Sequence, residues 1–340
     1  MISVIIPVYN GSRFLHKCLD ALFASTFKSF EVIVVDDCST DDSADISREK
    51  GARVLAMARN SGPAAARNLA AQTAECEILM FVDADVVVKN DTLERVAAIF
   101  ETRPEISALF GSYDDEPYEQ NFLSQYKNLQ HHFVHQNSSS EAATFWSGLG
   151  AIRREIFISM DGFDCKKFEV PSIEDIEFGA RLRQAGHRIL LDKNIQAKHL
   201  KKWTPLSHLR TEIFCRALPW SKLILTSQCL INDMNLRTSD RVSAILVGFC
   251  VLITPLVFWK PVLSVVLIIF LLTVLFLNRK IFHFFVRKKG ILFALFSFPW
   301  QLLYFFYSGA AFGYCWLRYA LPLVLGFRKA EEVNGIGHSP

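Results

Sequence analysis

The strongest constraint on the fold is a short apolar run that ends in two acids one residue apart. Ile78–Val82 is followed by Asp83 and Asp85, and such a run is typical of a strand buried on both faces. Two carboxylates at the end of a strand can reach one hard cation such as Mg²⁺ or Mn²⁺, which takes oxygen ligands and is commonly shared with a diphosphate. Taken alone, such a pair more often marks ordinary loop acids, so the surrounding pattern has to decide.

Apolar strands and amphipathic helices alternate through the first third of the chain. The predicted strands cover residues 3–8, 30–35, 52–55 and 77–82, and the predicted helices cover 13–25, 39–50, 64–74 and 92–100. This alternation predicts an α/β fold with a Rossmann-like, mostly parallel sheet and right-handed crossovers. Ligands of such sheets bind outside the carboxyl ends of the strands. Four acids fall at that edge: Asp36, Asp37, Asp83 and Asp85.

The pattern is less regular beyond residue 106. We expect irregular structure over 107–140, a glycine-containing strand over 145–152 that lets a ligand approach the backbone, a helix over 173–186 and a last strand over 187–191. His131 and His135 have the i, i+4 spacing that can ligate a metal on a helix, but packed or solvated histidines fit the spacing as well. The eight cysteines are scattered, which argues against a zinc site or a disulfide framework.

The composition changes sharply after Arg241. Three uncharged or nearly uncharged runs, 242–258, 262–277 and 291–317, raise the hydrophobic content of the 340-residue chain to 51%. Each run is close to the roughly 20 residues that cross about 30 Å of hydrocarbon, so we predict about three membrane spans. Residues 279–289 are basic and aromatic and are predicted to lie at the cytoplasmic interface. Residues 203–236 fit either interfacial helices or an ordinary packed helix pair.

These patterns predict four segments. Residues 1–200 form a catalytic domain, with a nucleotide-binding half at 1–105 and an acceptor half at 106–200. Interfacial helices follow at 201–240, then a transmembrane helical region at 241–325 and a polar tail at 326–340.

Five ordered motifs resemble those of the family 2 glycosyltransferases. They lie at residues 4–10, 34–41, 62–68, 81–85 and 174–175, and the resemblance covers roughly residues 1–220. It implies a glycosyltransferase A fold, a divalent metal (Mg²⁺ or Mn²⁺), a nucleotide-sugar donor and an inverting reaction. Many members of the family end in membrane helices, and such members commonly act on lipid carriers or surface polysaccharides.

The resemblance also implies roles for individual residues on the donor side. Residues at the ends of the first strands would contact the nucleotide, and residues near the last strand would complete the metal site. The implied nucleotide contacts are Pro7, Tyr9, Asp36 or Asp37, Arg67 and Asp83, and the implied metal ligands are Asp85, Asp83 and His199.

On the acceptor side, the resemblance makes Asp175 the general base and Glu174 its neighbour. A carboxylate within hydrogen-bond reach takes the proton of the attacking hydroxyl, and we expect a neighbouring acid together with partial burial to raise its pKa. Both acids could instead serve only to complement the dipole of the helix that they begin. Trp146, Gly148 and Arg216 are the predicted acceptor contacts.

Two positions depart from the family pattern. Gly11 stands where an acid usually follows the Tyr-Asn pair, which affects only a peripheral contact. Processive polysaccharide synthases carry a Gln-x-x-Arg-Trp motif before their membrane helices, and residues 213–217 keep only Arg216 of it. This favours a single transfer over chain extension.

The sequence therefore predicts an enzyme that moves one sugar, UDP-linked, to a membrane-associated acceptor such as a polyprenyl-phosphate carrier, a surface glycan or a glycolipid. We expect an integral protein of a bacterial-type inner membrane with a cytoplasmic catalytic domain, in contact with membrane lipids and not with nucleic acid. The alternatives are a processive synthase, a nucleotidyltransferase and a degenerate membrane scaffold. A nucleotidyltransferase needs a Gly-rich phosphate loop with an early Lys, which Gly11 and Lys17 fit poorly, and the intact acids argue against a scaffold.

Overall fold

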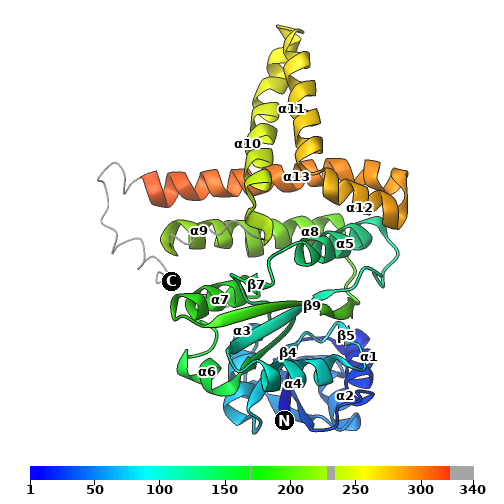
Figure 1. The fold of residues 1–340 in the computed structure, drawn as a ribbon, viewed down its shortest axis with the longest axis vertical. Helices are drawn as coiled ribbons and strands as arrows, with labels where there is room; N and C mark the ends of the chain where they lie inside the picture. Colours follow the sequence, from blue (N-terminus) through cyan, green and yellow to red (C-terminus); the bar gives the residue numbers. More distant parts are fainter. Residues whose placement is uncertain (169, 228–233, 322–340) are drawn as a thin grey trace. The chain divides into compact units, whose positions relative to one another are not determined.

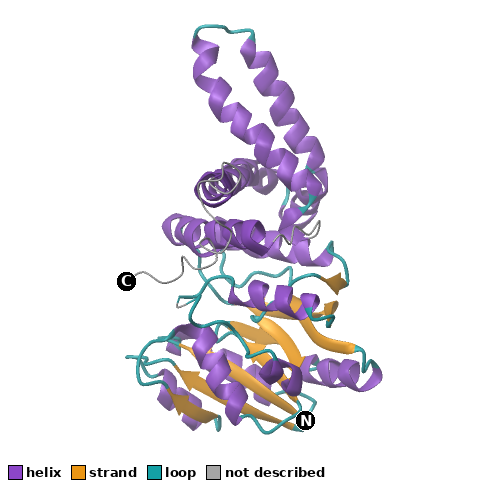
Figure 2. Cartoon of the chain, turned by 90° about the vertical axis from the view of Figure 1, so that its left-hand side faces the viewer, coloured by secondary structure: helices purple, strands orange, loops and turns teal. Residues whose placement is uncertain are grey.

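The computed structural model describes residues 1–168, 170–227 and 234–321, so the predicted polar tail at 326–340 lies outside the described residues. The chain divides into two compact units, Met1–Trp203 and a second unit that begins at Thr204. Every strand of the described residues belongs to the first unit, and the second is helical (Figures 1 and 2).

The first half of the first unit is a parallel α/β layer. The strands β1 (Ile2–Val8), β2 (Phe30–Asp36), β3 (Arg53–Ala56) and β4 (Ile78–Val82) lie in the order β3-β2-β1-β4 with parallel pairing throughout. The helices between and after them are α1 (Ser12–Phe23), α2 (Ser43–Glu49), α3 (Gly62–Thr73) and α4 (Thr92–Thr102). The predicted parallel half is therefore confirmed.

The rest of the sheet is mixed. β8 (Leu149–Arg153) runs antiparallel to β4 and to β6 (Ile106–Tyr113), whereas β6 and β9 (Arg188–His199) run parallel. Two short strands, β5 (Val86–Val88) and β7 (Glu141–Ala142), pair antiparallel with β9. β9 therefore continues well past the predicted end at residue 191 and reaches His199, next to β5.

The expectation of irregular structure over 107–140 is wrong. The segment holds most of β6 and the helix α5 (Phe122–Gln136). Periodicity of apolar residues could not identify α5, because its buried face is largely polar. The Asn128 amide donates to Asp114 O at 2.7 Å, and His132 Nδ1 lies 2.8 Å from Tyr113 O. Both of these buried side chains thus contact backbone carbonyls around the end of β6.

A buried aromatic cluster fixes the helix that carries the second acidic motif. α7 (Glu174–Gln184) follows the short helix α6 (Arg154–Ser159), and Phe178 of α7 packs in a set of rings with centroids 5.2 to 6.3 Å apart. Gly179 lets the helix approach the chain closely, since a Cβ there would lie 2.2 Å from the backbone nitrogen of Phe145. The other rings of the cluster belong to Phe81, Phe145, Phe157 and Phe163.

The second unit contains two helices long and apolar enough to cross a membrane, Thr238–Phe258 and Ile291–Ala320. A third apolar helix, α11 (Leu263–Leu277), passes the same test only together with α12 (Arg279–Lys289), from which it is bent by 69°. Its 15 residues are about 22 Å long at 1.5 Å per residue. Within the described residues, the count of spans is therefore two, or three if the bent pair is one span.

The two long apolar helices consist of α10 (Thr238–Ile253) with η3 (Thr254–Phe258) and of α13 (Ile291–Cys315) with η4 (Trp316–Ala320). Short helices precede them in the described part of the second unit: α8 (Pro205–Arg210), the π-helical η1 (Thr211–Ala217), α9 (Leu218–Ser227) and η2 (Met234–Leu236). α10 and α11 form an antiparallel pair (Figure 1), which is joined near Lys260 and Pro261.

Candidate functional site

A tight turn after β4 separates the two aspartates that follow it. The Val86 N–H donates to Asp83 O at 3.0 Å, and the Asp83 N–H donates to Gly148 O at 3.2 Å. The turn leads directly into β5, whose pairing with β9 sets Val86 opposite His199. The side chains of Asp83 and Asp85 therefore contact different residues and do not converge on one point.

Asp85 lies against His199. The Asp85 Oδ2 is 3.4 Å from His199 Nε2, and the Leu200 N–H donates to Asp85 O at 2.9 Å. Burial alone would raise the pKa of Asp85, but the charge and hydrogen bond of His199 outweigh it, so the pKa is lowered. The Asp85 carboxylate is therefore ionised at neutral pH.

The His199 imidazole is fixed by an aromatic stack. Its ring lies parallel to the Tyr113 ring, at 4.1 Å between centroids and 7° between planes. Trp146 meets the Tyr113 ring edge-on at 4.8 Å, and His131 packs against both Tyr113 and Trp146 at 4.4 and 4.7 Å. Since this stack packs against the imidazole of His199, the Asp85–His199 pair is held by the interior of the unit.

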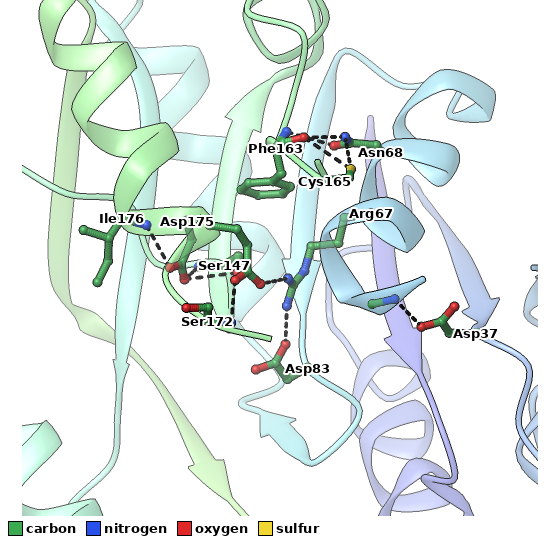
Figure 3. Close-up of polar contacts among 12 residues, drawn as sticks. Asp37, Arg67, Asn68, Asp83, Ser147, Phe163, Cys165, Ser172, Asp175 and Ile176 are labelled. Atoms are coloured by element: carbon green, nitrogen blue, oxygen red, sulfur yellow. Dashed lines mark hydrogen bonds and ion pairs between the residues drawn. The ribbon is translucent and has the colours of Figure 1, made fainter. Parts of the chain in front are cut away.

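Arg67 bridges the end of β4 to the start of α7 (Figure 3). Its guanidinium is 2.7 Å from Asp83 Oδ1 and 3.3 Å from Glu174 Oε1, and its side chain is only 4% exposed. Asn68, the next residue of α3, exchanges two hydrogen bonds with the backbone of Phe163, at 2.8 and 2.9 Å. The 62–68 motif therefore joins the two halves of the first unit.

Asp175 is held in place by its carboxylate. The N–H and the hydroxyl of Ser147 both donate to Oδ2, at 3.0 and 3.2 Å, and the Ile176 N–H donates to Oδ1 at 2.8 Å (Figure 3). Burial, and then the charge of Glu174, raise the pKa of Asp175 to about 6, against the opposing hydrogen bonds from Ser147. A carboxylate with a pKa close to neutrality is suited to proton transfer at physiological pH.

The loops after β1 and β2 are joined at the carboxyl edge of the sheet. The Asn10 N–H donates to Ser39 Oγ at 3.0 Å, and the Thr40 N–H donates back to Asn10 Oδ1 at 2.8 Å. Asp37 accepts the Ser61 and Gly62 N–H groups at the start of α3, both at 2.8 Å. The predicted nucleotide contacts Pro7, Tyr9, Asp36 and Asp37 thus lie on one rim, where the Tyr9 side chain is exposed.

The donor set of Asp85 and His199 fits a divalent metal in part. Carboxylate oxygen suits Mg²⁺ and Mn²⁺, and imidazole is a common metal ligand. Asp83 is engaged by Arg67, and no group of three His, Cys, Asp or Glu side chains within the described ranges could hold a metal ion. Two protein ligands leave the other positions to water and a substrate diphosphate, which is the usual pattern for Mg²⁺ at phosphate sites.

The predicted acceptor residues lie in different places. The Trp146 ring is half-buried in the aromatic stack and fills the space beside Gly148, where a Cβ would lie 2.7 Å from the ring. Arg216 belongs to the second unit, where it pairs with Glu212 at 2.8 Å. His131 and His135 pack ring to ring at 4.0 Å, and the described cysteines are free thiols.

Several site residues were missed in the sequence. Tyr113, Ser147 and Asn68 position the predicted residues, and the Ser172 N–H donates to Glu174 Oε2 at 2.9 Å. Asn68 could have been found from its place next to Arg67 in the 62–68 motif. Tyr113 and Ser147 act through contacts with residues far along the chain, and Ser172 acts through its backbone N–H, so the local sequence carries no signal for any of the three.

The Arg67 bridge leads to a stability prediction. Arg67→Met leaves Glu174 buried without its counter-charge, so we expect the free energy of unfolding to fall by about 3 kcal/mol, the low end for a broken buried pair because Asp83 is a third exposed. Thermal unfolding of the full chain in detergent measures this loss. Arg95→Met, which breaks an exposed pair with Asp91, is the matched control and should change stability by less than about 0.5 kcal/mol. Equal effects of the two variants would contradict the bridge.

Comparisons with known proteins identify relatives of the first part of the chain. The profile of the family described as "Glycosyl transferase family 2" matches residues 3–160, which ends before Glu174 and Asp175. Glycosyltransferase GlyG of Streptococcus pneumoniae is 34% identical over 99 residues, 28% of this chain and 33% of GlyG. TarS of Staphylococcus aureus, a poly(ribitol-phosphate) β-N-acetylglucosaminyltransferase, is 38% identical over 106 residues, 29% of this chain and 18% of TarS. The matched part thus spans a third or less of these relatives.

The fold has a solved counterpart over most of its length. The structure of the mannosyltransferase PcManGT from Pyrobaculum calidifontis, in complex with GDP-Man and Mn²⁺, covers 92% of this chain and 86% of its own chain, with a TM-score of 0.55 and 15% identity. At that identity the likeness shows the fold alone. The matched profile and the motifs within it show that residues 3–160 belong to the family 2 glycosyltransferases, and the fold is a glycosyltransferase A fold followed by apolar C-terminal helices.

Proposed function

We propose that this chain is a metal-dependent, inverting glycosyltransferase that moves one sugar from a UDP-sugar to a membrane-associated acceptor. The observation that supports it most is the arrangement around Arg67. One buried guanidinium touches both the acid at the end of β4 and the acid next to Asp175. The donor edge and the base are thus parts of one site, as a displacement reaction requires.

Donor binding is assigned to the carboxyl edge of the parallel half. The rim of Pro7, Tyr9, Asp36 and Asp37 would hold the nucleoside, and Asp85 with His199 would hold the cation on the diphosphate. A bound Mg²⁺ or Mn²⁺ supplies positive charge that stabilises the leaving diphosphate. Arg67, neutralised by two acids, acts as a positioning residue that fixes Asp83 and Glu174 rather than as a donor ligand.

Asp175 is assigned as the general base. Ser147 and the Ile176 N–H orient its carboxylate, and burial beside Glu174 raises the pKa to about 6. The carboxylate takes the proton of the acceptor hydroxyl as the oxygen attacks the anomeric carbon, and the bond to the diphosphate breaks on the opposite face. A single displacement of this kind inverts the anomeric configuration.

The acceptor is proposed to be carried at a membrane. Two helices are long and apolar enough to span one, and by the positive-inside rule the basic residues of α12 favour the proposal of a cytoplasmic catalytic unit. TarS transfers N-acetylglucosamine to poly(ribitol phosphate), as its name states, which supports testing UDP-N-acetylhexosamines and polyol-phosphate or lipid-phosphate acceptors first. Trp146, Gly148 and Arg216 stay predictions as acceptor contacts.

A nucleotide-sugar panel tests the donor. The full chain in detergent is expected to gain thermal stability with one UDP-sugar in the presence of Mn²⁺ and much less with either component alone, because two protein ligands hold the metal weakly without the diphosphate. Slow hydrolysis of the same donor separates an enzyme from a degenerate scaffold. Stabilisation by no nucleotide sugar, with or without Mn²⁺, would overturn the proposal.

The pKa of Asp175 sets the expected pH dependence. The base acts only when ionised, so kcat should be constant above about pH 6 and fall about tenfold per pH unit below it. Ser147→Ala removes a hydrogen bond that lowers this pKa, so the acidic limb of the pH profile of kcat should move to higher pH in this variant. Glu155→Gln, an exposed acid-to-amide change in α6, is the control and should leave the limb in place. A limb that stays fixed in Ser147→Ala would contradict the assignment of Asp175.

A further inference from the structure

We infer that the outer face of α12 is a binding surface for the phosphate headgroups of anionic membrane lipids. This rests on the proposal that the second unit lies in a membrane, and it names the lipid that the unit selects. The surface consists of the exposed cationic side chains of α12 around Lys280 and Arg287.

The inner face of α12 is fixed by packing. Ile281, Phe282 and Phe285 are buried, with at most 8% of each residue exposed. The Phe282 ring lies 5.7 Å from Phe298, and the Phe285 ring lies 5.6 Å from Phe293, both on α13. These three buried residues hold α12 along α13 (Figure 1). The opposite face of α12 therefore points away from α13 and cannot rotate toward it.

Both ends of α12 are fixed as well. At its start, the buried Asn278 donates to Ser243 Oγ of α10 at 2.9 Å and to Val274 O at 2.8 Å, which holds the 69° bend from α11. At its end, Gly290 has φ +85°, a conformation that a residue with a Cβ rarely adopts. Both ends of α12 are therefore fixed, and α12 is a separate helix between the apolar helices α11 and α13.

The outward face is basic. At 100° per residue, Lys280, His283 and Arg287 fall within about 60° of one another, opposite the buried stripe, and all three are exposed. Arg279, Lys288 and Lys289 add further positive charge to the same helix. Five permanent cations on eleven residues are expensive to place next to hydrocarbon unless anions neutralise them.

Within the described residues of α10 to α13, Asp240 is the only acid, because the sequence contains neither Asp nor Glu between Asp240 and Glu331. Phosphate headgroups of an anionic leaflet supply negative charge at the depth where an interfacial helix lies. Charge complementarity therefore favours anionic lipid as the partner of this face over an acidic protein.

Electron paramagnetic resonance of spin-labelled lipids tests the inference. The full chain is reconstituted in phosphatidylcholine bilayers, and the motionally restricted fraction is compared for spin-labelled phosphatidylglycerol and phosphatidylcholine. We expect the wild type to prefer phosphatidylglycerol. The triple variant R279Q/K280Q/R287Q should lose at least tenfold of that preference, since each interfacial cation contributes about fivefold. The charge-conserving variant R279K/K280R/R287K should retain it.

A matched control is available in the first unit. K28Q/R48Q/K89Q removes the same three charges from exposed positions of the catalytic unit and should leave the lipid preference unchanged. Equal restriction of the two lipids by the wild type, or an undiminished preference in the α12 variant, would overturn the inference. Different results would contradict the other two proposals. Release of the chain from membranes at alkaline pH would contradict the membrane proposal, and lack of donor hydrolysis in detergent would contradict the enzymatic proposal.

Discussion

Asp175→Asn should reduce kcat by about 10² to 10⁴-fold while donor binding is unchanged. The amide keeps the shape of the carboxylate and its place near Ser147, but it cannot accept the proton of the acceptor hydroxyl. Donor affinity is expected to persist because the proposed nucleotide and metal residues lie on other strands. Single-turnover transfer measures the first quantity, and titration calorimetry of the UDP-sugar with Mn²⁺ measures the second.

Glu155→Gln serves as the control for Asp175→Asn, since it makes the same chemical change at an exposed position of α6. Its transfer rate should equal that of the wild type. Retention of more than about a tenth of the activity by Asp175→Asn would remove the assignment of the base, because general base catalysis contributes at least a hundredfold in most enzymes.

Asp85→Ala should abolish the metal dependence of donor binding and lower kcat/KM by about 10³-fold or more. The expected size follows from the several kcal/mol that a cation contributes to a developing charge, at 1.36 kcal/mol for each factor of ten. The residue accepts a close contact from His199, so its loss also leaves the imidazole without its partner. Calorimetry of the UDP-sugar at increasing Mn²⁺ concentration reports the loss without relying on turnover.

Asp91→Ala offers a control at the start of α4, where the acid pairs with Arg95 on the surface. It should retain the Mn²⁺ dependence in full. His199→Ala should resemble Asp85→Ala in binding, since both side chains are proposed to hold the same cation. Donor binding that responds to Mn²⁺ identically in wild type and Asp85→Ala would exclude this residue as a metal ligand, whatever the effect on rate.

The parallel half of the fold was predictable because its signals are local. Apolar runs such as Ile78–Val82 are buried along their whole length, and α1 buries Leu15, Leu19 and Leu22 at helical spacing. α5 and β6, in the half predicted to bind the acceptor, were not predictable in this way. Asn128, His132 and Ser112 are buried polar residues whose partners are backbone carbonyls, and a hydrophobicity pattern does not register them.

The same distinction between local signals and distant contacts applies to the site residues. Asp85 and Asp175 could be picked out from motifs, and the contacts that hold them could not. Asp83 looked like a second ligand for the cation because it stands two residues before Asp85. The turn that sends it toward Arg67 depends on β5 pairing with β9, more than a hundred residues later in the chain. The geometry of two acids at a strand end is thus set by a distant strand.

The position of β9 has a practical consequence for work with partial chains. The matched family segment ends at residue 160. A fragment cut there would lack β9, the strand that pairs with both β5 and β6. It would also leave the guanidinium of Arg67 without Glu174. The boundary drawn by sequence conservation in relatives is therefore not a boundary for folding, and expression trials that stop there should yield aggregated or proteolysed material, whereas trimming is best tried after Trp203.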